Sequence, residues 1–265
     1  MTDLSERTHR VEGPLAADGR IRKEGIDVPQ EIIDRLRAAL EAALEGEVHF
    51  SIGACALYAT DASNYRQIPY GVVVPKTPED VVAAMRLCNS HDVPITPRGG
   101  GTSLAGQTCN TSIIIDFSKY RVVSIDPERR VAVVEPGCIL DHLRSEANKY
   151  GLTFGPDPVT RDHNTLGGMI DNDSCGVHSV VAGRTAENVQ SLDVLTYDGV
   201  RMTVRPTSPA ELSHCLQAAG GALNFIVRCS NSGASTASIS RRSIRRSRVA
   251  SPATRTLITC RPRRA

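Results

Sequence analysis

Hydrophobic residues in the first quarter of the chain follow a helical period. Between Pro29 and Gly46, leucine and isoleucine recur at steps of three and four residues with charged residues between them, at Ile32, Ile33, Leu36, Leu40 and Leu44. This spacing places one apolar stripe along a helix. The pattern predicts an amphipathic helix segment over residues 29–50, preceded by a polar, flexible arm over residues 1–28.

From residue 70 onward, short β-branched runs alternate with helical patterns. The run Val72–Val74, the helical pattern of residues 78–91 and the run of residues 94–97 predict a β-α-β unit. Further strands are predicted at residues 113–116, 122–125, 131–135, 189–197 and 202–205, with a helix at 139–150. Asp198-Gly199 is a hairpin turn signal. The sequence therefore predicts an α+β domain with mixed sheets over residues 51–220.

The composition changes near residue 220. All 29 acidic residues lie at or before Glu211, whereas ten arginines lie from Arg228 onward, so the net charge of +2 is −8 for residues 1–211 plus +10 for residues 212–265. Ser and Arg dominate residues 221–265, and neither period persists there. Three interpretations are open: a disordered basic tail, an arm that binds nucleic acid or an anionic surface, and out-of-frame translation. We favour the last, because Arg without Lys and the loss of acidic residues are what a shifted reading of a GC-rich message gives.

Several classes of protein conflict with the composition. The longest apolar runs are far shorter than the roughly 20 residues of a membrane helix, and the first residues lack the apolar core of a signal peptide. We therefore expect a cytoplasmic protein. The eight cysteines show no CxxC and no metal-binding spacing, which favours buried or free thiols and no metal site. The absence of Trp argues against single-strand nucleic-acid binding.

Residues 97–107, Pro-Arg-Gly-Gly-Gly-Thr-Ser-Leu-Ala-Gly-Gln, carry the strongest chemical signal. Three glycines followed by two hydroxyl residues allow positive φ and expose backbone amides in a concave nest suited to a diphosphate. A mobile surface turn is the alternative. Gln107 stands where the NTPase P-loop needs Lys, and Leu104 stands where the dinucleotide fingerprint needs its last Gly. Both common nucleotide motifs therefore fit poorly.

A second glycine-rich cluster follows at residues 155–158 (Gly-Pro-Asp-Pro), 165–169 (Thr-Leu-Gly-Gly-Met) and 172–176 (Asn-Asp-Ser-Cys-Gly). Paired glycines let the backbone approach a ligand, while Asn, Ser and Thr offer neutral donors and acceptors for a heterocycle and a ribose. No acid-base triad emerges. We interpret His163 and His178 as structural hydrogen-bonding residues, since a lone His more often has that role.

Six motifs in order resemble a known family. Residues 72–82, 97–107, 134–137, 155–158, 165–169 and 172–176 look like the FAD-linked oxidases with a p-cresol methylhydroxylase (vanillyl-alcohol oxidase) type flavin domain. They are most similar to the D-lactate dehydrogenase and glycolate oxidase flavoprotein branch, particularly the long bacterial proteins that add an iron-sulfur half. The resemblance implies a two-lobed FAD-binding domain. That domain is expected to be incomplete at its C-terminal end, because nothing after Gly221 matches the family's Gly-Thr-Glu-Gly strand or its cap domain.

The resemblance also implies the cofactor-binding residues: Arg98, Gly99, Gly100, Gly101, Thr102, Ser103, Pro136, Gly137, Asp157, Thr165, Gly167, Gly168, Asn172, Ser174, Cys175, Gly176, Asn188 and Val189. Residues 99–103 would surround the FAD diphosphate, and Asn188 and Val189 would lie near the adenine. Thr102 occupies the place where members with covalent flavin often carry His, so noncovalent FAD is expected. The branch has neutral residues where this chain has Asp171 and Asp173, which predicts weaker binding of an anionic cofactor.

By the same resemblance, the parent activity is hydride removal from a 2-hydroxy acid, of the D-lactate or glycolate type, to flavin, giving the 2-oxo acid. Electrons would pass to a quinone, cytochrome or iron-sulfur carrier, which allows a peripheral location at the inner membrane face. The catalytic residues are unknown and are expected in the family's C-terminal half, which is missing from this chain, and an iron-sulfur cluster is expected only in the full-length parent. The alternatives are an inactive or flavin-binding-only fragment and a basic-tailed nucleic-acid binder.

Overall fold

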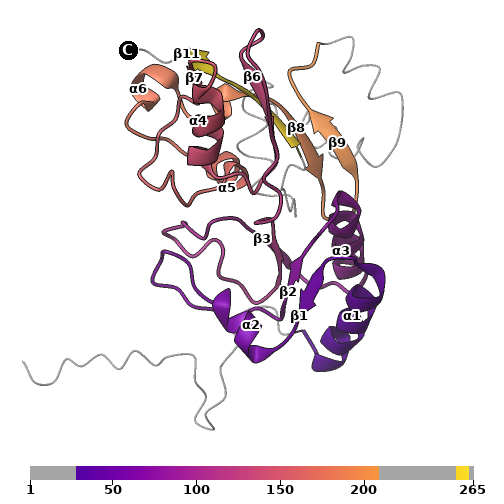
Figure 1. Cartoon of the computed structure of the whole chain (residues 1–265). Helices are drawn as coiled ribbons and strands as arrows, with labels where there is room; N and C mark the ends of the chain where they lie inside the picture. The colour runs from indigo at the N-terminus through magenta and orange to yellow at the C-terminus, as the bar shows by residue number, and fades with distance from the viewer. Residues whose placement is uncertain (1–27, 209–254, 263–265) are drawn as a thin grey trace, which may run out of the picture.

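The computed structural model describes residues 28–208 and 255–262, which form two lobes, each built on its own sheet (Figure 1). The predicted arm lies outside the described residues except for Val28. Residues 209–254 and 263–265, which include most of the predicted tail, also lie outside them. The mixed α and β fold class predicted from the sequence is confirmed.

The first lobe contains a four-stranded sheet in the order β1-β2-β4-β3. Its strands are β1 (Glu47–His49), β2 (Gly71–Val74), β3 (Ile95–Arg98) and β4 (Ile113–Asp116). Strands β2, β4 and β3 run parallel, and β1 pairs antiparallel with β2. The helices of this lobe are α1 (Gln30–Ala43), α2 (Ile52–Leu57) and α3 (Pro78–Ser90). The predicted β-α-β unit is therefore present, with β3 displaced by one residue.

The helices of the first lobe form for reasons that the sequence shows. Leu36 and Leu40 of α1 are fully buried against α3 and the sheet. Helix α3 begins with a capping box, in which the Thr77 side chain and the Asp80 carboxylate each accept a backbone N–H. Strand β1 pairs with β2, so residues 29–50 belong to the core of this lobe instead of forming a separate segment.

The second lobe contains a five-stranded antiparallel sheet in the order β5-β6-β10-β8-β9. Its strands are β5 (Val123–Asp126), β6 (Val131–Val134), β8 (Val189–Leu195), β9 (Arg201–Val204) and β10 (Arg255–Thr259). The smaller elements are α4 (Leu140–Asn148), β7 (Leu152–Thr153), α5 (Leu166–Asp171), α6 (Ser179–Ala182), η1 (Thr185–Asn188) and β11 (Arg261–Pro262). Leu143, Phe154 and Met169 fill the core beneath this sheet.

Strand β10 corrects the prediction for the end of the chain. Residues 221–265 were expected to form a disordered Arg/Ser-rich tail without regular structure. The described residues 255–262 instead form β10 and β11, and β10 lies between β6 and β8 in the middle of the sheet (Figure 1). Thr256, Ile258 and Cys260 point alternately inward and are 2%, 0% and 1% exposed. Ile258 and Cys260 are part of the hydrophobic core of the second lobe.

Strand β8 joins the two lobes. Leu195 at its end is fully buried in the core of the first lobe. Just beyond it, the Tyr197 hydroxyl donates to the carbonyl oxygens of Val93 at 2.8 Å and Cys88 at 3.3 Å. These contacts hold the β8–β9 hairpin of the second lobe against the end of α3 in the first lobe.

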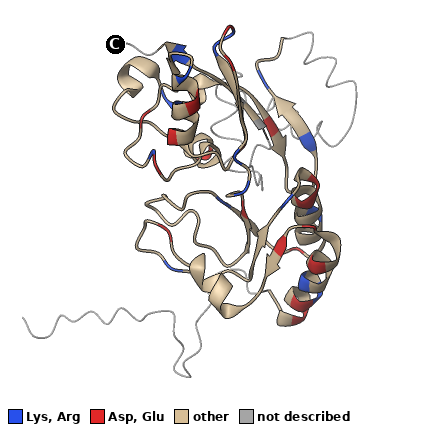
Figure 2. Cartoon of the chain, in the orientation of Figure 1, with Lys and Arg blue, Asp and Glu red and all other residues tan. Residues whose placement is uncertain are grey.

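Charged residues of both signs share the outer face of α1 (Figure 2). Arg37 and Glu41 form an i,i+4 ion pair at 2.8 Å on this face, with about half of each side chain exposed. Such a pair contributes little stability. In the described ranges, no helix is long and apolar enough to cross a membrane.

Candidate cofactor site

The triple-glycine loop of residues 99–101 follows β3 and touches the second lobe. A methyl group at Gly99 would lie 2.2 Å from the Thr165 hydroxyl oxygen, and one at Gly100 would lie 2.1 Å from the His163 carbonyl oxygen. Among these three glycines, Gly101 alone has a positive φ, of 65°. Gly99 and Gly100 are therefore required by close packing between the triple-glycine loop and residues 163–165 of the second lobe. The sequence predicted the loop but assigned all three glycines to backbone freedom.

The amides of this loop are free to bind a ligand. Within the part of the chain that the structure describes, the backbone N–H groups of residues 99–103 make no hydrogen bond. These residues are half-buried, apart from the exposed Gly100. Half-buried backbone donors normally find a partner in the protein, in water or in a ligand. Five successive donors are what the predicted nest requires.

Arg98 holds the loop in place. One guanidinium nitrogen donates to the Thr60 carbonyl oxygen at 2.9 Å, and the other donates to the carbonyl and hydroxyl oxygens of Thr108 at 3.4 and 3.3 Å. The Ala62 N–H donates to the Gly101 carbonyl oxygen at 3.0 Å. Arg98 thus connects the glycine loop with residues 60–62, which sequence reasoning did not associate with the site.

Tyr58 contacts both Arg98 and the end of the neighbouring strand β4. Its hydroxyl donates to the Asp116 carboxylate at 2.5 Å, and its ring lies 5.8 Å below the Arg98 guanidinium. Burial, together with the hydrogen bond and charge of Asp116, raises the pKa of Tyr58. Arg98 and Asp116 are register partners at the ends of β3 and β4. No motif in the sequence links Tyr58 to this strand end, so only the topology identifies it.

The motif of residues 165–168 lies beside residues 136–137. Thr165 caps α5 by accepting the Gly168 N–H at 3.4 Å. The Gly167 N–H donates to the Pro136 carbonyl oxygen at 2.9 Å, and a methyl group at Gly167 would lie 2.9 Å from the Pro136 side chain. Gly137 is equally restricted, because a methyl group there would lie 1.8 Å from the Phe117 carbonyl oxygen. The structure therefore brings these predicted residues together.

The motif of residues 172–176 curves around the end of α5. The Asn172 side chain donates to the Gly168 carbonyl oxygen at 3.1 Å, and Ser174 accepts the Thr185 N–H at 3.0 Å through its carbonyl oxygen. Gly176 has no room for a side chain, because a methyl group would lie 2.0 Å from the Asp157 carbonyl. Cys175 is exposed.

Asp173 has a local partner for its charge. Its carboxylate lies 2.9 Å from the Arg184 guanidinium and accepts the Ala186 N–H at 3.0 Å. Its φ is 48°, a left-handed conformation that Asp tolerates better than most residues. One of the two carboxylates expected to weaken cofactor binding is therefore neutralised by an arginine eleven residues away in the sequence.

Asn188 is fixed inside the second lobe. It is 1% exposed, and its amide nitrogen donates to the carbonyl oxygens of Ala182 at 2.9 Å and Arg184 at 2.8 Å. Its Oδ1 atom has no hydrogen-bond partner among the described residues. Val189 begins β8 directly after it. The expected position of both residues at the adenine end stays a prediction.

An open cleft of about 520 Å³ lies between the lobes at the triple-glycine loop. From the first lobe it is lined by Leu57, Thr60, Asp61, Ala62, Arg98, Gly100, Gly101 and Thr102, and from the second by Val159, Thr160, Asp162 and His163. This volume is within the ~300–1,000 Å³ of small-molecule sites. The Asp61 carboxylate accepts the Thr108 hydroxyl at 3.0 Å, and Asp162 pairs with His163 at 2.7 Å. Both acidic groups in the lining therefore have local partners.

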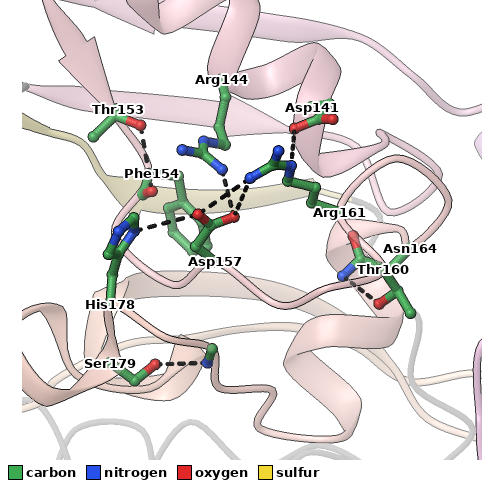
Figure 3. Close-up of polar contacts among 11 residues, drawn as sticks. Asp141, Arg144, Thr153, Phe154, Asp157, Thr160, Arg161, Asn164, His178 and Ser179 are labelled. Atoms are coloured by element: carbon green, nitrogen blue, oxygen red, sulfur yellow. Dashed lines mark hydrogen bonds and ion pairs between the residues drawn. The ribbon is translucent and has the colours of Figure 1, made fainter.

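Asp157 lies in a cluster of polar and charged side chains (Figure 3). Its carboxylate is bound by Arg144 of α4 at 2.5 Å, by Arg161 at 3.4 Å and by His178 at 3.3 Å. The side chain is 6% exposed. Asp157 was predicted to contact the cofactor, but its side chain faces this cluster. Sequence reasoning missed Arg144, because nothing in a helical pattern marks one arginine as an ion-pair partner.

The residues present fit FAD. Five free amides suit a diphosphate, the cleft wall combines apolar side chains with hydroxyl groups, and two buried amide oxygens, of Asn164 and Asn188, lack a partner in the described chain. Such unpaired polar atoms normally have a ligand or water as their partner.

Curated relatives share this sequence over part of their length. A D-2-hydroxyglutarate dehydrogenase of Escherichia coli K12 is 33% identical over 71% of this chain, which corresponds to 19% of the relative. Glycolate oxidase subunit GlcD of Bacillus subtilis is 34% identical over 54% of this chain and 31% of the relative. The chain thus spans between about a fifth and a third of the length of these relatives.

The fold also matches solved structures. Xylooligosaccharide oxidase from Myceliophthora thermophila C1 has a TM-score of 0.63 at 20% identity, over 87% of this chain and 43% of that protein. The family model described as "FAD binding domain" matches residues 69–204, about half of the chain. The resemblance to FAD-linked oxidases with a p-cresol methylhydroxylase type flavin domain is therefore confirmed, and the chain belongs to the FAD binding domain family.

Proposed function

We propose that this chain binds FAD noncovalently and forms the flavin-binding part of a 2-hydroxy-acid dehydrogenase or oxidase. One observation carries the proposal: the backbone amides of residues 99–103 have no hydrogen-bond partner among the described residues, and three of these residues, Gly100, Gly101 and Thr102, line the cleft between the lobes. The similarity to D-2-hydroxyglutarate dehydrogenase and to glycolate oxidase subunit GlcD supports the reaction class.

Each motif has a part in the proposed site. Residues 99–103 would hold the diphosphate through their backbone amides. Arg98 would keep this loop in position through its hydrogen bonds to Thr60 and Thr108. Pro136 and Gly137 would support the adjoining loop, while residues 165–168 and 172–176 would run along the flavin. Asn188 would offer its unpaired Oδ1 atom to a donor at the adenine end. The Asp157 carboxylate is bound by three side chains of the protein itself.

The noncovalent attachment rests on Thr102. This residue lines the cleft at the place where covalent members of the family often carry His. His163 also lines the cleft, and its ring pairs with Asp162 at 2.7 Å. Flavin should therefore leave the protein on acid precipitation and appear in the supernatant.

The chemistry supplied by a bound flavin is acceptance of hydride from the carbinol carbon of the 2-hydroxy acid. The described residues would orient the cofactor and shield it from water. The substrate candidates are D-2-hydroxyglutarate, glycolate and D-lactate, and the electron acceptor would be a quinone, cytochrome or iron-sulfur carrier. We place the protein in the cytoplasm or at the inner face of the membrane through that acceptor.

The proposal is tested by titrating the purified chain with FAD, riboflavin and ADP. We expect FAD to bind more tightly than riboflavin, and ADP to compete, because the free amides recognise the diphosphate. Equal binding of FAD and riboflavin would contradict the proposed diphosphate site. Anaerobic addition of the three 2-hydroxy acids then separates an enzyme from a flavin-binding-only protein: bleaching at about 450 nm indicates turnover of the flavin, and no bleaching indicates binding alone.

A further inference from the structure

We propose that Asp157 is a positioning residue: with Arg144 and Arg161 it fixes the loop of residues 158–165, which forms the second-lobe wall of the cofactor cleft. This inference rests on the proposed function, because the cleft is taken as the FAD site. It replaces direct cofactor contact by Asp157 with an indirect role.

The Asp157 carboxylate is fully used within the protein. Oδ1 accepts from Arg144 at 2.5 Å and from Arg161 at 3.4 Å, while Oδ2 lies 3.4 Å from Arg161 and 3.3 Å from His178 Nδ1. In Figure 3 both guanidinium groups and the imidazole point toward this one carboxylate. Asp157 lines a neighbouring hollow of about 400 Å³, which shares Val159 and Asp162 with the cofactor cleft, and it is not among the residues that line the cleft itself. Its effect on a cofactor must therefore pass through its partners.

The loop of residues 158–165 has little apolar anchoring before its end. Val159 is 94% exposed, and residues 160–163 are exposed as well. Polar contacts set its position instead. The Arg161 guanidinium reaches Asp157 and lies 3.6 Å from Asp141.

The first turn of α4 holds the same loop from the other side. Its Leu140 and Asp141 N–H groups donate to the carbonyl oxygens of Asn164 at 3.2 Å and Arg161 at 3.1 Å. The first N–H groups of a helix have no partner within the helix, so the loop and α4 satisfy each other. Arg144, one turn later in α4, adds the ion pair to Asp157. Helix α4 and Asp157 therefore clamp both ends of the loop.

The clamped loop meets the triple-glycine loop directly. The His163 carbonyl oxygen and the Thr165 hydroxyl are the atoms that leave no room for side chains at Gly100 and Gly99. Val159, Thr160 and His163 line the cleft. Movement of the loop would therefore displace the second-lobe wall of the cleft. It would also remove the atoms that pack against Gly99 and Gly100 of the triple-glycine loop.

Loss of the clamp should weaken FAD binding, because a smaller fraction of the molecules would have the loop in the conformation that binds FAD. If the loop is in place in only a tenth of the molecules, the apparent Kd rises about tenfold, since it scales inversely with that fraction. Removal of either member of the Arg144–Asp157 pair should weaken the clamp. Loss of Arg144 takes away the shortest of the three contacts to the buried carboxylate, and loss of the Asp157 charge leaves the Arg144 guanidinium without its ion-pair partner.

The test compares the full chain with Asp157→Asn, Arg144→Gln, Arg144→Lys and the double variant Arg144→Gln/Asp157→Asn. Arg37→Gln, which breaks the exposed ion pair on α1, is the matched control. Two quantities are measured: the Kd for FAD, and amide hydrogen exchange of peptides from residues 158–165 and from α1. The α1 peptide reports global unfolding, so local loss of order is separated from loss of the fold.

We expect about tenfold weaker FAD binding and faster exchange at residues 158–165 in both single neutral variants, with unchanged exchange in α1. The double variant should be no weaker than either single variant, and Arg144→Lys should be intermediate. Weaker binding with unchanged exchange at residues 158–165 would overturn the inference and indicate direct contact by Asp157. If the wild-type chain fails to bind FAD, the proposed function fails, while exchange at residues 158–165 still decides whether Asp157 clamps the loop.

Discussion

Substitution of Ile258 by Ala tests whether the end of the chain completes the second lobe. Ile258 is 0% exposed and lies in β10, in the same core as Val134, Leu143 and Phe154. Replacing a fully buried Ile by Ala removes three carbons and leaves a cavity, which typically costs about 2–5 kcal/mol. For a domain of this size, that loss corresponds to a fall in Tm of roughly 4–20 °C.

The assay is urea denaturation followed by far-UV circular dichroism, since the chain contains no Trp for fluorescence. Val204→Ala is the matched control, because Val204 lies in the edge strand β9 and is 41% exposed. The control should change the free energy of unfolding by no more than about 0.5 kcal/mol. If Ile258→Ala is as mild as the control, β10 does not pack in the sheet, and residues 255–262 are the unstructured tail that the composition predicted.

Two further predictions concern the stability of the fold at low pH and the reactivity of the cysteine thiols. Burial opposes ionisation of Asp80, but backbone hydrogen bonds from Glu45, Lys76 and Thr77 outweigh it and lower the pKa. Its contribution is therefore present above about pH 4 and is lost as the pH falls through the lowered value; Asp80→Asn should cost about 1 kcal/mol at pH 7 and flatten the acid limb of the stability profile. In the native chain, Cys175 should react with a thiol reagent within minutes while Cys88 reacts only on unfolding, because Cys88 is buried and burial raises its pKa to about 12. Equal acid sensitivity of the Asn variant, or equal labelling rates by mass spectrometry, would contradict these predictions.

The sequence predicted the elements whose pattern is long or whose end signals are strong. Helices α1 and α3 have clear apolar stripes, and Pro78 follows the capping residue Thr77. Strand β4 occupies the predicted residues 113–116 because a continuous apolar run is buried on both faces. Strand β1 and helix α5 were missed, since three residues or a Gly-Gly pair show no period.

The end of the chain was misjudged for a different reason. Thr256, Ile258 and Cys260 alternate as a half-buried strand does, but the Arg-rich composition around them hid a period of only three inward positions. The site shows the same division. The motifs identified the loops that meet, whereas Tyr58 and Arg144 come from ordinary helical and turn sequence and are brought to the site by topology alone.

The measurement that tests the central claim most directly is FAD affinity of the full chain against Gly100→Ala. A methyl group at Gly100 would lie 2.1 Å from the His163 carbonyl oxygen and force the triple-glycine loop away from the loop of residues 158–165. Gly53→Ala serves as the control, because a methyl group there would have no atom within 4 Å. Quenching of FAD fluorescence should show binding by the wild-type and Gly53→Ala chains, and binding at least about tenfold weaker by Gly100→Ala, because a displaced loop reduces the competent fraction. Equal affinity of the three chains for FAD would contradict the assignment of residues 99–103 as the cofactor site.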